Sequence, residues 1–348
     1  MQSEPGRSIW SPVASSPDVI VIGAGVLGLC SAAELAGRGH AVTVIDPGRP
    51  NASSIAAGMI APALESLLED LPPDRAALLK RARDLWPAFA ASHGLTLLRE
   101  GAEWRGPAAP AAAARLRALG FDARPNASGL TTPDDWRIEV GPALKTLTRL
   151  PGLTLVRGEV ARLVGDARRW RVETSDGRVW FSATVILATG AGDPIEGLPD
   201  RVAAAVSAIT PIRGQLTLVP VAAPPCVIRG PGVYVAPCEG GVVIGATMEA
   251  GRRDLDPDPI EASRQVSAGL DLLGVAGEAG STRVGVRGAT ADGLPLAGPS
   301  GAPGLHLALG PRRNGWLMGP LVAQVTADGI EGRPPVPDAA ALDPLRFA

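Results

Sequence analysis

The segment Val19–Gly28, which reads VIVIGAGVLG, constrains the fold of this chain more than any other part of the sequence. Its continuous apolar run is typical of a strand that is buried on both faces of a parallel sheet. Gly23 then permits a tight turn, Gly25 lets a pyrophosphate approach the backbone, and Gly28 lets a helix pack closely on the sheet. The segment therefore predicts the first β-α-β unit of a dinucleotide-binding fold.

The residues around the glycines strengthen this prediction. The N–H groups of Val26 and Leu27 are expected to be free at the start of the helix, where they can donate to phosphate oxygens. Asp46 ends the next apolar run, 23 residues after Gly23, which is the usual place for an acid that accepts the ribose hydroxyls. The alternative for Asp46 is a structural role as the cap of a turn. An acid at this position disfavours a 2′-phosphate, so NADP is not expected.

Composition and charge exclude several other classes of protein. The 348 residues carry a formal net charge of −2 and no basic block, so neither nucleic acid nor an anionic membrane surface is expected as a partner. The apolar runs end well short of a membrane-spanning helix. The three cysteines show neither metal-ligand spacing nor a disulfide pattern, which favours a cytoplasmic location and no metal site. Residues 1–17 are polar and contain prolines, which indicates a disordered leader rather than a signal peptide.

Helical and strand patterns indicate a mixed α/β (α+β) fold. Helices are expected over Val26–Gly39, Ala76–Phe89 (kinked or ended at Pro87), Ala111–Leu119, Pro259–Leu273 and Asn314–Asp328. Strands are expected over Asp18–Gly23, Ala41–Ile45, Leu153–Val164, Trp170–Glu173, Val179–Phe181, Val185–Ala188, Thr282–Arg287, Leu305–Leu309 and within 214–248. We expect a Rossmann-like nucleotide-binding domain, residues 18–75, 140–205 and 280–348, interrupted by an antiparallel-sheet substrate domain, residues 76–139 and 206–279.

Two further segments bear on the choice between FAD and NAD. Residues 185–192, VILATGAG, have the form of the strand-to-turn element found beside FAD in flavoproteins with two dinucleotide folds, which brings Gly190 to the cofactor. Residues 53–62, SSIAAGMIAP, are a loop of small residues that lets backbone approach a flat ring and a diphosphate. Either segment alone is also compatible with an ordinary tight turn. A simple NAD-dependent dehydrogenase would leave the first segment, and the R-N-G sequence near residue 314, without a purpose.

The ordered set of motifs resembles the D-amino-acid oxidase superfamily of FAD-dependent oxidoreductases, and most of all the glycine oxidases of thiamine biosynthesis. The resemblance extends from about Asp18 to Ile330. It depends on VIGAGVLG…VID, AAGMIAP, PIRGQ, YVAP…GGVVIGATME, GVRGATADGLPLAG and LALGPRRNG, which are each commonplace but are specific as a series. It implies that FAD is bound noncovalently, because no cysteine occupies a position associated with covalent attachment.

The resemblance also implies which residues hold FAD. The adenine would contact the backbone of Val160. The turn Pro311–Leu317 would lie against the flavin ring, where a helix starting near Asn314 directs its free N–H groups and its dipole at the negative charge of reduced flavin. The further positions that it implies along the cofactor are Ala52, Ser53, Ala57, Gly58, Met59, Gly190, Arg313, Gly315, Trp316 and Leu317.

Three residues match positions that hold the substrate carboxylate in glycine oxidases: Tyr234, Arg287 and Arg313. Arg287 lies in an apolar strand, VGVRGAT, where a guanidinium needs an anion and its planar fork suits a carboxylate. The alternatives are a structural ion pair for Arg287 and a core position for Tyr234, the only tyrosine of the chain. Arg312 adjoins Arg313, so the match could shift by one residue.

The activity implied is oxidative deamination of glycine, another small (D-)amino acid or an N-methylated amine. Hydride would pass from Cα to flavin N5, and O2 would accept the electrons to give H2O2, so the enzyme positions its substrate and needs no catalytic histidine. A thiazole synthase is a candidate partner for the imine, and a homo-oligomer is compatible with the sequence. Two alternatives share the motifs: a dehydrogenase with a quinone or protein acceptor, and a flavin-binding homologue without turnover. The cap region between Gly106 and Trp136 is shorter than the family usually has, which favours the second alternative slightly.

Overall fold

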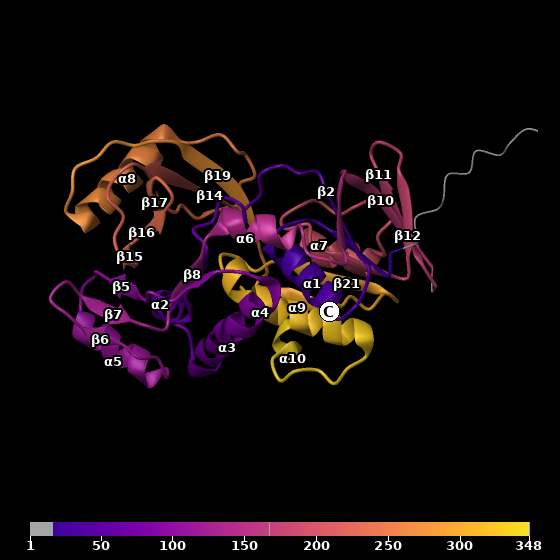
Figure 1. Cartoon of the computed structure of the whole chain (residues 1–348), viewed down its shortest axis with the longest axis horizontal. Helices are drawn as coiled ribbons and strands as arrows, with labels where there is room; N and C mark the ends of the chain where they lie inside the picture. The colour runs from indigo at the N-terminus through magenta and orange to yellow at the C-terminus, as the bar shows by residue number, and fades with distance from the viewer. Residues whose placement is uncertain (1–16, 167, 348) are drawn as a thin grey trace, which may run out of the picture.

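The computed structural model describes residues 17–166 and 168–347, so all but the last residue of the leader expected over 1–17 lies outside the described residues. Figure 1 shows a molecule of two halves. One half contains α1, α9 and the strands β2 and β10–β12, and the other contains α8 with β14–β17 and β19. The nucleotide motif belongs to the first half.

A six-stranded sheet forms the core of the first half. Its strands, in spatial order, are β20 (Leu296–Pro299), β21 (Leu305–Leu309), β13 (Thr184–Leu187), β1 (Val19–Ile22), β2 (Val42–Asp46) and β9 (Leu153–Arg157). Neighbouring strands are parallel except β20 and β21. Because β1 is central and all four of its residues are buried, its sequence is a continuous apolar run rather than an alternating one.

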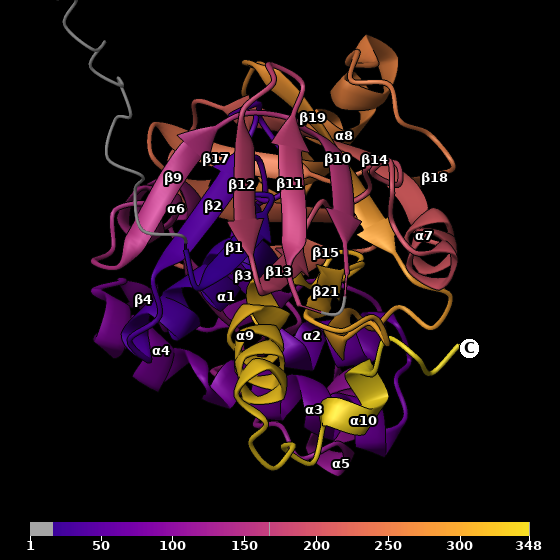
Figure 2. The same ribbon diagram turned by 90° about the vertical axis from the view of Figure 1, so that its right-hand side faces the viewer.

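Two different layers cover the faces of this sheet. Val19 and Val21 belong to the core beneath helices α1 (Val26–Gly37) and α9 (Gly315–Glu331), whereas Ile20 and Ile22 belong to the core on the other face. That second face is covered by α7 (Asp200–Ser207) and by a meander of β10 (Val160–Gly165), β11 (Trp170–Thr174) and β12 (Val179–Ser182). Figure 2 shows the three strands of the meander side by side.

Helices α1 and α9 pack closely on each other. A Cβ at Gly319 would lie 2.9 Å from the Cys30 sulfur, so glycine is required at this crossing. Both helices lie over the same face of the sheet and start at its carboxyl edge. Their first turns are consequently near neighbours of the nucleotide motif.

A larger, mostly antiparallel sheet forms the core of the other half. Its strands, in spatial order, are β18 (Glu249–Ala250), β14 (Thr210–Val219), β17 (Gly241–Gly245), β16 (Val233–Cys238), β15 (Val227–Gly230), β5 (Ala102–Trp104), β7 (Leu130–Thr132) and β6 (Arg124–Pro125), and β19 (Thr282–Ala289) pairs with β14. Helix α8 (Pro259–Leu273) covers one part, capped by the Asp258 carboxylate, which accepts from the N–H groups of Ile260 and Glu261. Helix α5 (Ala109–Ala118) covers β6 and β7.

Short elements join the two halves. They are the helices α2 (Pro62–Leu68), α3 (Pro73–Asp84), α4 (Trp86–His93), α6 (Val140–Leu147) and α10 (Ala339–Leu342), and a small sheet of β3 (Met59–Ile60), β8 (Trp136–Ile138) and β4 (Leu97–Leu98). The Trp86 indole N–H donates to the carbonyl of Trp316 at 2.9 Å, which fixes α4 to the start of α9. No helix among residues 17–166 and 168–347 has the length and apolarity needed to span a membrane.

The structure confirms the mixed α/β class, corrects one expected strand and bears out the interruption expected at Pro87. The strand expected over 153–164 divides at Gly158, because β9 pairs with β2 in the parallel sheet and β10 starts the meander. The helix expected over Ala76–Phe89 is divided into α3 and α4, since Pro87 has no N–H to continue a helix and instead occupies the first turn of α4. The boundary expected at residue 280 also differs from the strand pairing, because β19 is hydrogen-bonded to β14 along its whole length.

Candidate active site

The three glycines of the nucleotide motif occupy the turn between β1 and α1 for different reasons. Gly23 has a φ of +109°, and a Cβ there would lie 2.3 Å from the Ala188 carbonyl oxygen. A Cβ at Gly28 would lie 2.1 Å from the Gly23 carbonyl oxygen. Gly25 has a φ of −72°, and the nearest atom to its Cβ would be the Ser53 hydroxyl oxygen at 3.4 Å. The fold itself therefore requires Gly23 and Gly28, whereas the space beside Gly25 is open to a ligand.

Polar groups converge on the same turn. The Val26 N–H was expected to be free, but it donates to the Ser53 hydroxyl at 2.9 Å because the loop after β2 packs against this turn. The Asp46 carboxylate, at the end of β2, accepts from the N–H groups of Ala24 at 2.7 Å and Gly48 at 2.6 Å. These bonds hold the carboxylate beside the glycine turn, where the ribose of a bound dinucleotide would lie.

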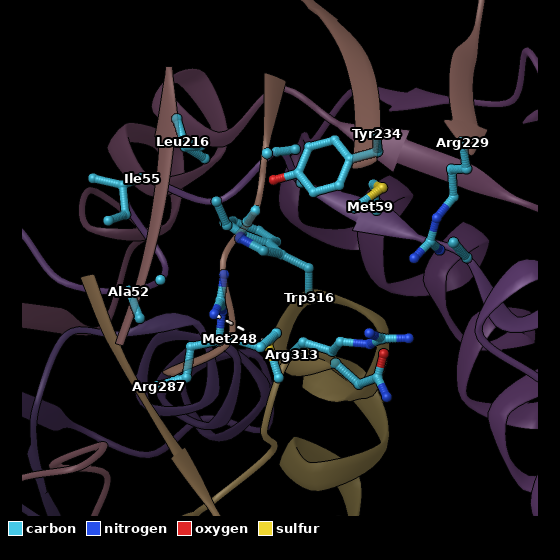
Figure 3. A pocket seen from close by; sticks show the side chains of 18 of the residues that line it. Ala52, Ile55, Met59, Leu216, Arg229, Tyr234, Met248, Arg287, Arg313 and Trp316 are labelled. Atoms are coloured by element: carbon cyan, nitrogen blue, oxygen red, sulfur yellow. Dashed lines mark hydrogen bonds between the residues drawn. The ribbon is translucent and has the colours of Figure 1, made fainter. Parts of the chain in front are cut away.

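Two connected cavities begin at this turn. The first, of about 100 Å³, extends from Gly25 past the segment Ala308–Arg313 to Arg287. The second, of about 280 Å³, lies against the substrate sheet and includes Tyr234. Both are lined by Ala52, Ala56, Arg287, Arg313 and Trp316. The shared lining makes one continuous space that leads from the nucleotide turn to the substrate sheet. Figure 3 shows the part of this space that lies against the substrate sheet.

The loop of small residues after β2 forms one wall of this space. Ala57, Gly58 and Met59 line the second cavity. Gly58 has a φ of +70°, and a Cβ there would lie 2.1 Å from the carbonyl oxygen of Ile138. The loop is therefore pressed against β8, and its small side chains leave the facing volume empty.

The start of α9 forms the opposite wall. Its N-cap residue, Asn314, makes no side-chain capping hydrogen bond. The positive end of the helix dipole therefore faces the space, and the Asn314 side chain accepts no hydrogen bond from the N–H groups of the first turn. The Trp316 indole N–H donates to the Ser53 carbonyl at 3.2 Å, which joins α9 to the loop of small residues. This end of the space therefore favours negative charge in a bound group.

Arg287, on β19, faces the junction of the two cavities and has no carboxylate partner among the described residues. Its Nη1 donates to the Thr247 carbonyl at 3.1 Å and lies 3.3 Å from the Met248 sulfur. A Cβ at Gly214 would lie 2.2 Å from the same nitrogen, so the neighbouring strand leaves room for the guanidinium. Burial lowers the pKa of Arg287 below its usual value. A largely desolvated cation without a partner is unfavourable in the free protein and well placed to bind an anion.

Tyr234, on β16, lines the second cavity. It lies opposite Gly245 on β17, where a Cβ would come within 3.1 Å of the phenolic oxygen. Burial raises the pKa of Tyr234, and the nearby arginine charges do not offset this. The hydroxyl therefore stays protonated and can donate a hydrogen bond to a carboxylate.

Arg313 differs from Arg287 because it is paired with two carboxylates. Its Nε donates to Glu65 at 2.5 Å, and its Nη2 lies 3.0 Å from a carboxylate oxygen of Glu69. Glu65 also accepts from Nη1 of Arg229 at 2.8 Å. Burial opposes ionisation of Glu65, but the charges of Arg229 and Arg313 outweigh it and hold the pKa of Glu65 below its usual value. Arg312 also pairs with Glu69, at 2.5 Å, so the two adjacent arginines share an anchor.

Helix α2, which carries Glu65, is held at its start by Asp135. The Asp135 carboxylate accepts from the N–H groups of Ala63 at 2.7 Å and Leu64 at 3.0 Å. It is almost completely buried, and burial raises the pKa of Asp135 to about 7 against the effect of these two hydrogen bonds. Asp135 thus fixes the direction in which α2 presents Glu65 to the cavity.

The structure brings most of the predicted residues to the connected cavities. The predicted residues that line them are Gly25, Val26, Leu27, Ala52, Ser53, Ala57, Gly58, Met59, Gly190, Tyr234, Arg287, Arg313, Asn314, Gly315 and Trp316. Gly23, Gly28 and Asp46 shape the turn where the space begins. Two others line neither cavity. Leu317 is 1% exposed in the core, and Val160 lies near the end of β2, two residues after Gly158, whose N–H donates to the Asp46 carbonyl at 3.0 Å.

Sequence reasoning missed the buried network of Glu65 with Arg229. Arg229 lies in the strand segment CVIRGPGVYV, and the criterion that drew attention to Arg287, an arginine within an apolar strand, would have found it. Glu65 lies in a short helix, ALESLLED, whose sequence does not distinguish a buried acid from an exposed one. Its role depends on two arginines that are 164 and 248 residues away in the chain.

The chain is similar to known proteins along nearly its whole length. The model of the family described as FAD dependent oxidoreductase (DAO) matches residues 18–329. The protein of Burkholderia multivorans named tRNA 5-methylaminomethyl-2-thiouridine biosynthesis bifunctional protein MnmC is 32% identical over 99% of this chain and 61% of its own length. The protein of the same name from Caulobacter sp. is 28% identical over 97% of this chain and 59% of its own length. The chain thus spans about three fifths of the curated relatives that it matches.

Solved structures with the same fold include several enzymes that act on amino acids. Glycine oxidase from Geobacillus kaustophilus superposes with a TM-score of 0.78 at 24% identity, covering 95% of this chain and 98% of the other. Iminodiacetate oxidase from Chelativorans sp. BNC1 gives 0.77 at 24% identity, covering 92% and 98%. L-proline dehydrogenase from P. horikoshii gives 0.78 at 19% identity, covering 96% and 98%.

The fold and the connected cavities define a nucleotide-dependent oxidoreductase with a separate substrate sheet. More specifically, the chain belongs to the D-amino-acid oxidase family of FAD-dependent oxidoreductases, as its sequence resemblance predicted. The structure fits this cofactor. The Asp46 carboxylate at the glycine turn, the open volume beside Gly25 and the uncapped start of α9 provide the surroundings that a ribose, a pyrophosphate and an electron-accepting ring require.

Proposed function

We propose that this protein oxidises the C–N bond of glycine, another small (D-)amino acid or an N-methylated amine, and that Arg287 binds the substrate carboxylate. The observation that carries the proposal is a desolvated guanidinium with no carboxylate partner at the junction of the two cavities. The protonated Tyr234 hydroxyl lines the same cavity and supplies a neutral donor for the carboxylate. FAD, when bound, supplies the two-electron acceptor for the oxidation.

The protein contributes by positioning and desolvation rather than by proton transfer. Glu65 is ionised but engaged by two arginines, and Tyr234 is held protonated, so neither ionisable side chain is suited to act as a base near neutral pH. No histidine lines either cavity among the described residues. A substrate whose amine reacts as the neutral species needs orientation of its Cα–H bond, which a charged fork and a hydroxyl provide.

The residues at the glycine turn, in the loop of small residues and at the start of α9 are proposed to hold FAD noncovalently. Cys30 is buried in α1, and Cys226 and Cys238 are half-buried elsewhere. None of the three lines these cavities. We further propose that O2 is the electron acceptor, that the protein acts in the cytoplasm and that a thiazole synthase receives the imine. We also propose a cofactor domain of residues 18–75, 140–205 and 280–348 and a substrate domain of residues 76–139 and 206–279, except that β19 belongs to the substrate sheet.

Anaerobic mixing of the FAD-loaded protein with glycine, sarcosine or D-alanine tests the proposal. Loss of the visible absorbance of oxidised flavin, followed by recovery and peroxide formation on admitting air, is expected for an oxidase. Bleaching without recovery would identify a dehydrogenase with another acceptor. A flavin that none of the amino acids reduces would contradict the proposed reaction, and would leave a different amine substrate or a flavin-binding homologue without turnover.

A second candidate substrate comes from the curated relatives. Their name assigns them to the biosynthesis of 5-methylaminomethyl-2-thiouridine in tRNA, and the B. multivorans protein is similar to this chain along 99% of its length. The second candidate is therefore an amine carried on a tRNA base. Reduction of the flavin by tRNA bearing such an amine, but not by free amino acids, would favour it over the first.

A further inference from the structure

Arg229 is a second arginine whose guanidinium faces the substrate cavity. It lies at the end of β15, and only 5% of the residue is exposed. Its Nη1 donates to Glu65, but its Nε and Nη2 make no hydrogen bond with any described residue. Both nitrogens retain some accessible surface, and Arg229 lines the cavity.

The charges around the cavity exceed what one carboxylate would balance. The charged side chains that line it are the guanidinium groups of Arg229, Arg287 and Arg313 and the carboxylate of Glu65. Glu65 forms ion pairs with both Arg229 and Arg313, and Glu69 supports Arg313 from behind. A substrate with one carboxylate would satisfy Arg287 and leave the free N–H groups of Arg229 without an acceptor. Buried donors without acceptors are unfavourable, so a second acceptor group in the ligand would stabilise the complex.

The two free guanidinium faces lie at different ends of the cavity. Figure 3 shows Arg229 and Arg287 on opposite sides, with Tyr234 and Trp316 between them. Around Arg229 the lining includes Gly230 and Gly232, which contribute no side chains. An extended ligand can therefore place one end on Arg287 and the other on Arg229.

We infer that Arg229 forms a second acceptor-binding subsite, and that the substrate is an amino acid carrying a carboxylate or carbonyl group opposite its α-carboxylate. Glu65 is the positioning residue, because its ion pair holds the Arg229 fork with one edge toward the cavity. This inference rests on the proposed function and narrows its substrate class. The acceptor group can be attached through the amine nitrogen or through Cα, and the two attachments are separate arms of the test.

The test compares matched substrates that differ only in the distal acceptor. In the first set the acceptor is attached through the amine nitrogen: iminodiacetate is compared with N-isobutylglycine, and N-(2-carboxyethyl)glycine with N-isopentylglycine. N-(carbamoylmethyl)glycine replaces the distal carboxylate by a neutral carbonyl. Cα-linked pairs are D-aspartate with D-leucine and D-glutamate with D-homoleucine. We expect kcat/KM for at least one acceptor substrate to exceed that of its alkyl partner by about tenfold or more, as one charge-assisted hydrogen bond supplies.

Variants then assign this preference to Arg229. The acceptor-to-alkyl ratio should fall to about one in Arg229→Met, and should be intermediate in Arg229→Lys, which keeps a charge for Glu65 but loses the planar fork. Arg264→Met is the control, because Arg264 lies on the exposed surface of α8 and pairs only with Glu261. That control should keep the wild-type ratio.

The outcomes separate this inference from the proposed function. Turnover of alkyl and acceptor substrates at equal efficiency would overturn the subsite and leave the proposed function standing, as would a preference that persists in Arg229→Met. If none of the amino acids reduces the flavin, the proposed function fails. The subsite is then tested by binding: changes in the spectrum of oxidised flavin give the dissociation constant of each ligand. Tighter binding of the acceptor ligands that disappears in Arg229→Met and is reduced in Arg229→Lys would support the subsite, and equal binding would overturn it.

Discussion

Replacing Arg287 by methionine should stabilise the substrate-free protein while removing most of its activity. Arg287 is half-buried, burial lowers its pKa, and its hydrogen-bonding partners in the protein are a carbonyl and a thioether. Methionine fills a similar volume without the charge. Exchange of buried ionic groups for apolar ones stabilises proteins by about 1–4 kcal/mol, and because Arg287 is half-buried we expect about 1 kcal/mol, the lower end of that range.

The loss of activity follows from the same charge. A desolvated carboxylate that loses its cationic partner forfeits about 3–5 kcal/mol, so kcat/KM for glycine or sarcosine should fall about 10²- to 10⁴-fold in Arg287→Met. Stability is measured by urea unfolding of the two proteins at one fixed FAD concentration, since bound cofactor shifts the apparent stability. FAD content is determined from the visible spectrum, so that loss of cofactor is not mistaken for loss of substrate binding.

Arg229→Met is the matched comparison, because it removes an arginine that does have a buried partner. Glu65 would keep only Arg313, and we expect Arg229→Met to lower the free energy of unfolding by about 3 kcal/mol. The two substitutions thus have opposite signs although the chemical change is identical. If Arg287→Met destabilised the protein as much as Arg229→Met, Arg287 would have a structural partner and the assignment of the substrate carboxylate would be wrong.

Three further predictions concern the cofactor turn and two buried titratable groups. Gly25→Val should give folded but colourless protein, because the valine side chain occupies the ligand volume, whereas Gly28→Val should not fold, because its Cβ would meet the Gly23 carbonyl. Circular dichroism reports folding and the visible spectrum reports bound flavin. A yellow Gly25→Val protein would refute the nucleotide site. Burial raises the pKa of Asp135 to about 7, so its contribution to stability is greatest below about pH 4 and is lost as pH rises to about 7; unfolding of Asp135→Asn across this range should lack that loss. Burial lowers the pKa of His306 to about 4, so the native state is destabilised as pH falls from about 6.5 to 4; His306→Gln should flatten this limb, and an unchanged profile would show that other groups cause it.

The nucleotide half of the fold was predictable because local rules determine it. The apolar run before Gly23, the glycine spacing and the acid at Asp46 each follow from short-range backbone requirements, and the structure places them as those requirements demand. The division of residues 153–164 was not predictable in the same way. β9 and β10 have similar strand-forming sequences, and only their pairing partners, β2 and β11, distinguish a parallel strand from the start of a meander.

The site was predictable where one side chain is unusual for its element and was missed where several distant side chains depend on each other. Arg287 was singled out by resemblance, and its charge in an apolar strand independently called for an anion. Glu65 was missed because its burial is caused by Arg229 and Arg313, and no local pattern in its helix reports them. Arg313 was singled out by resemblance, but its two carboxylate partners become visible only when α2 is placed beside the start of α9.

The order in which this chain is made on the ribosome is unfavourable for the packing of α1 against α9. Helix α1 is nearly all buried in the finished protein, and α9, which covers it, consists of residues 315–331. β21, at residues 305–309, is also made late, although it neighbours β13 in the central sheet. A nascent chain that already contains the nucleotide turn and the whole substrate sheet therefore still exposes the apolar side of α1. Chaperones that bind exposed apolar helices should hold this protein until its final segments emerge, and FAD should be captured only after that release.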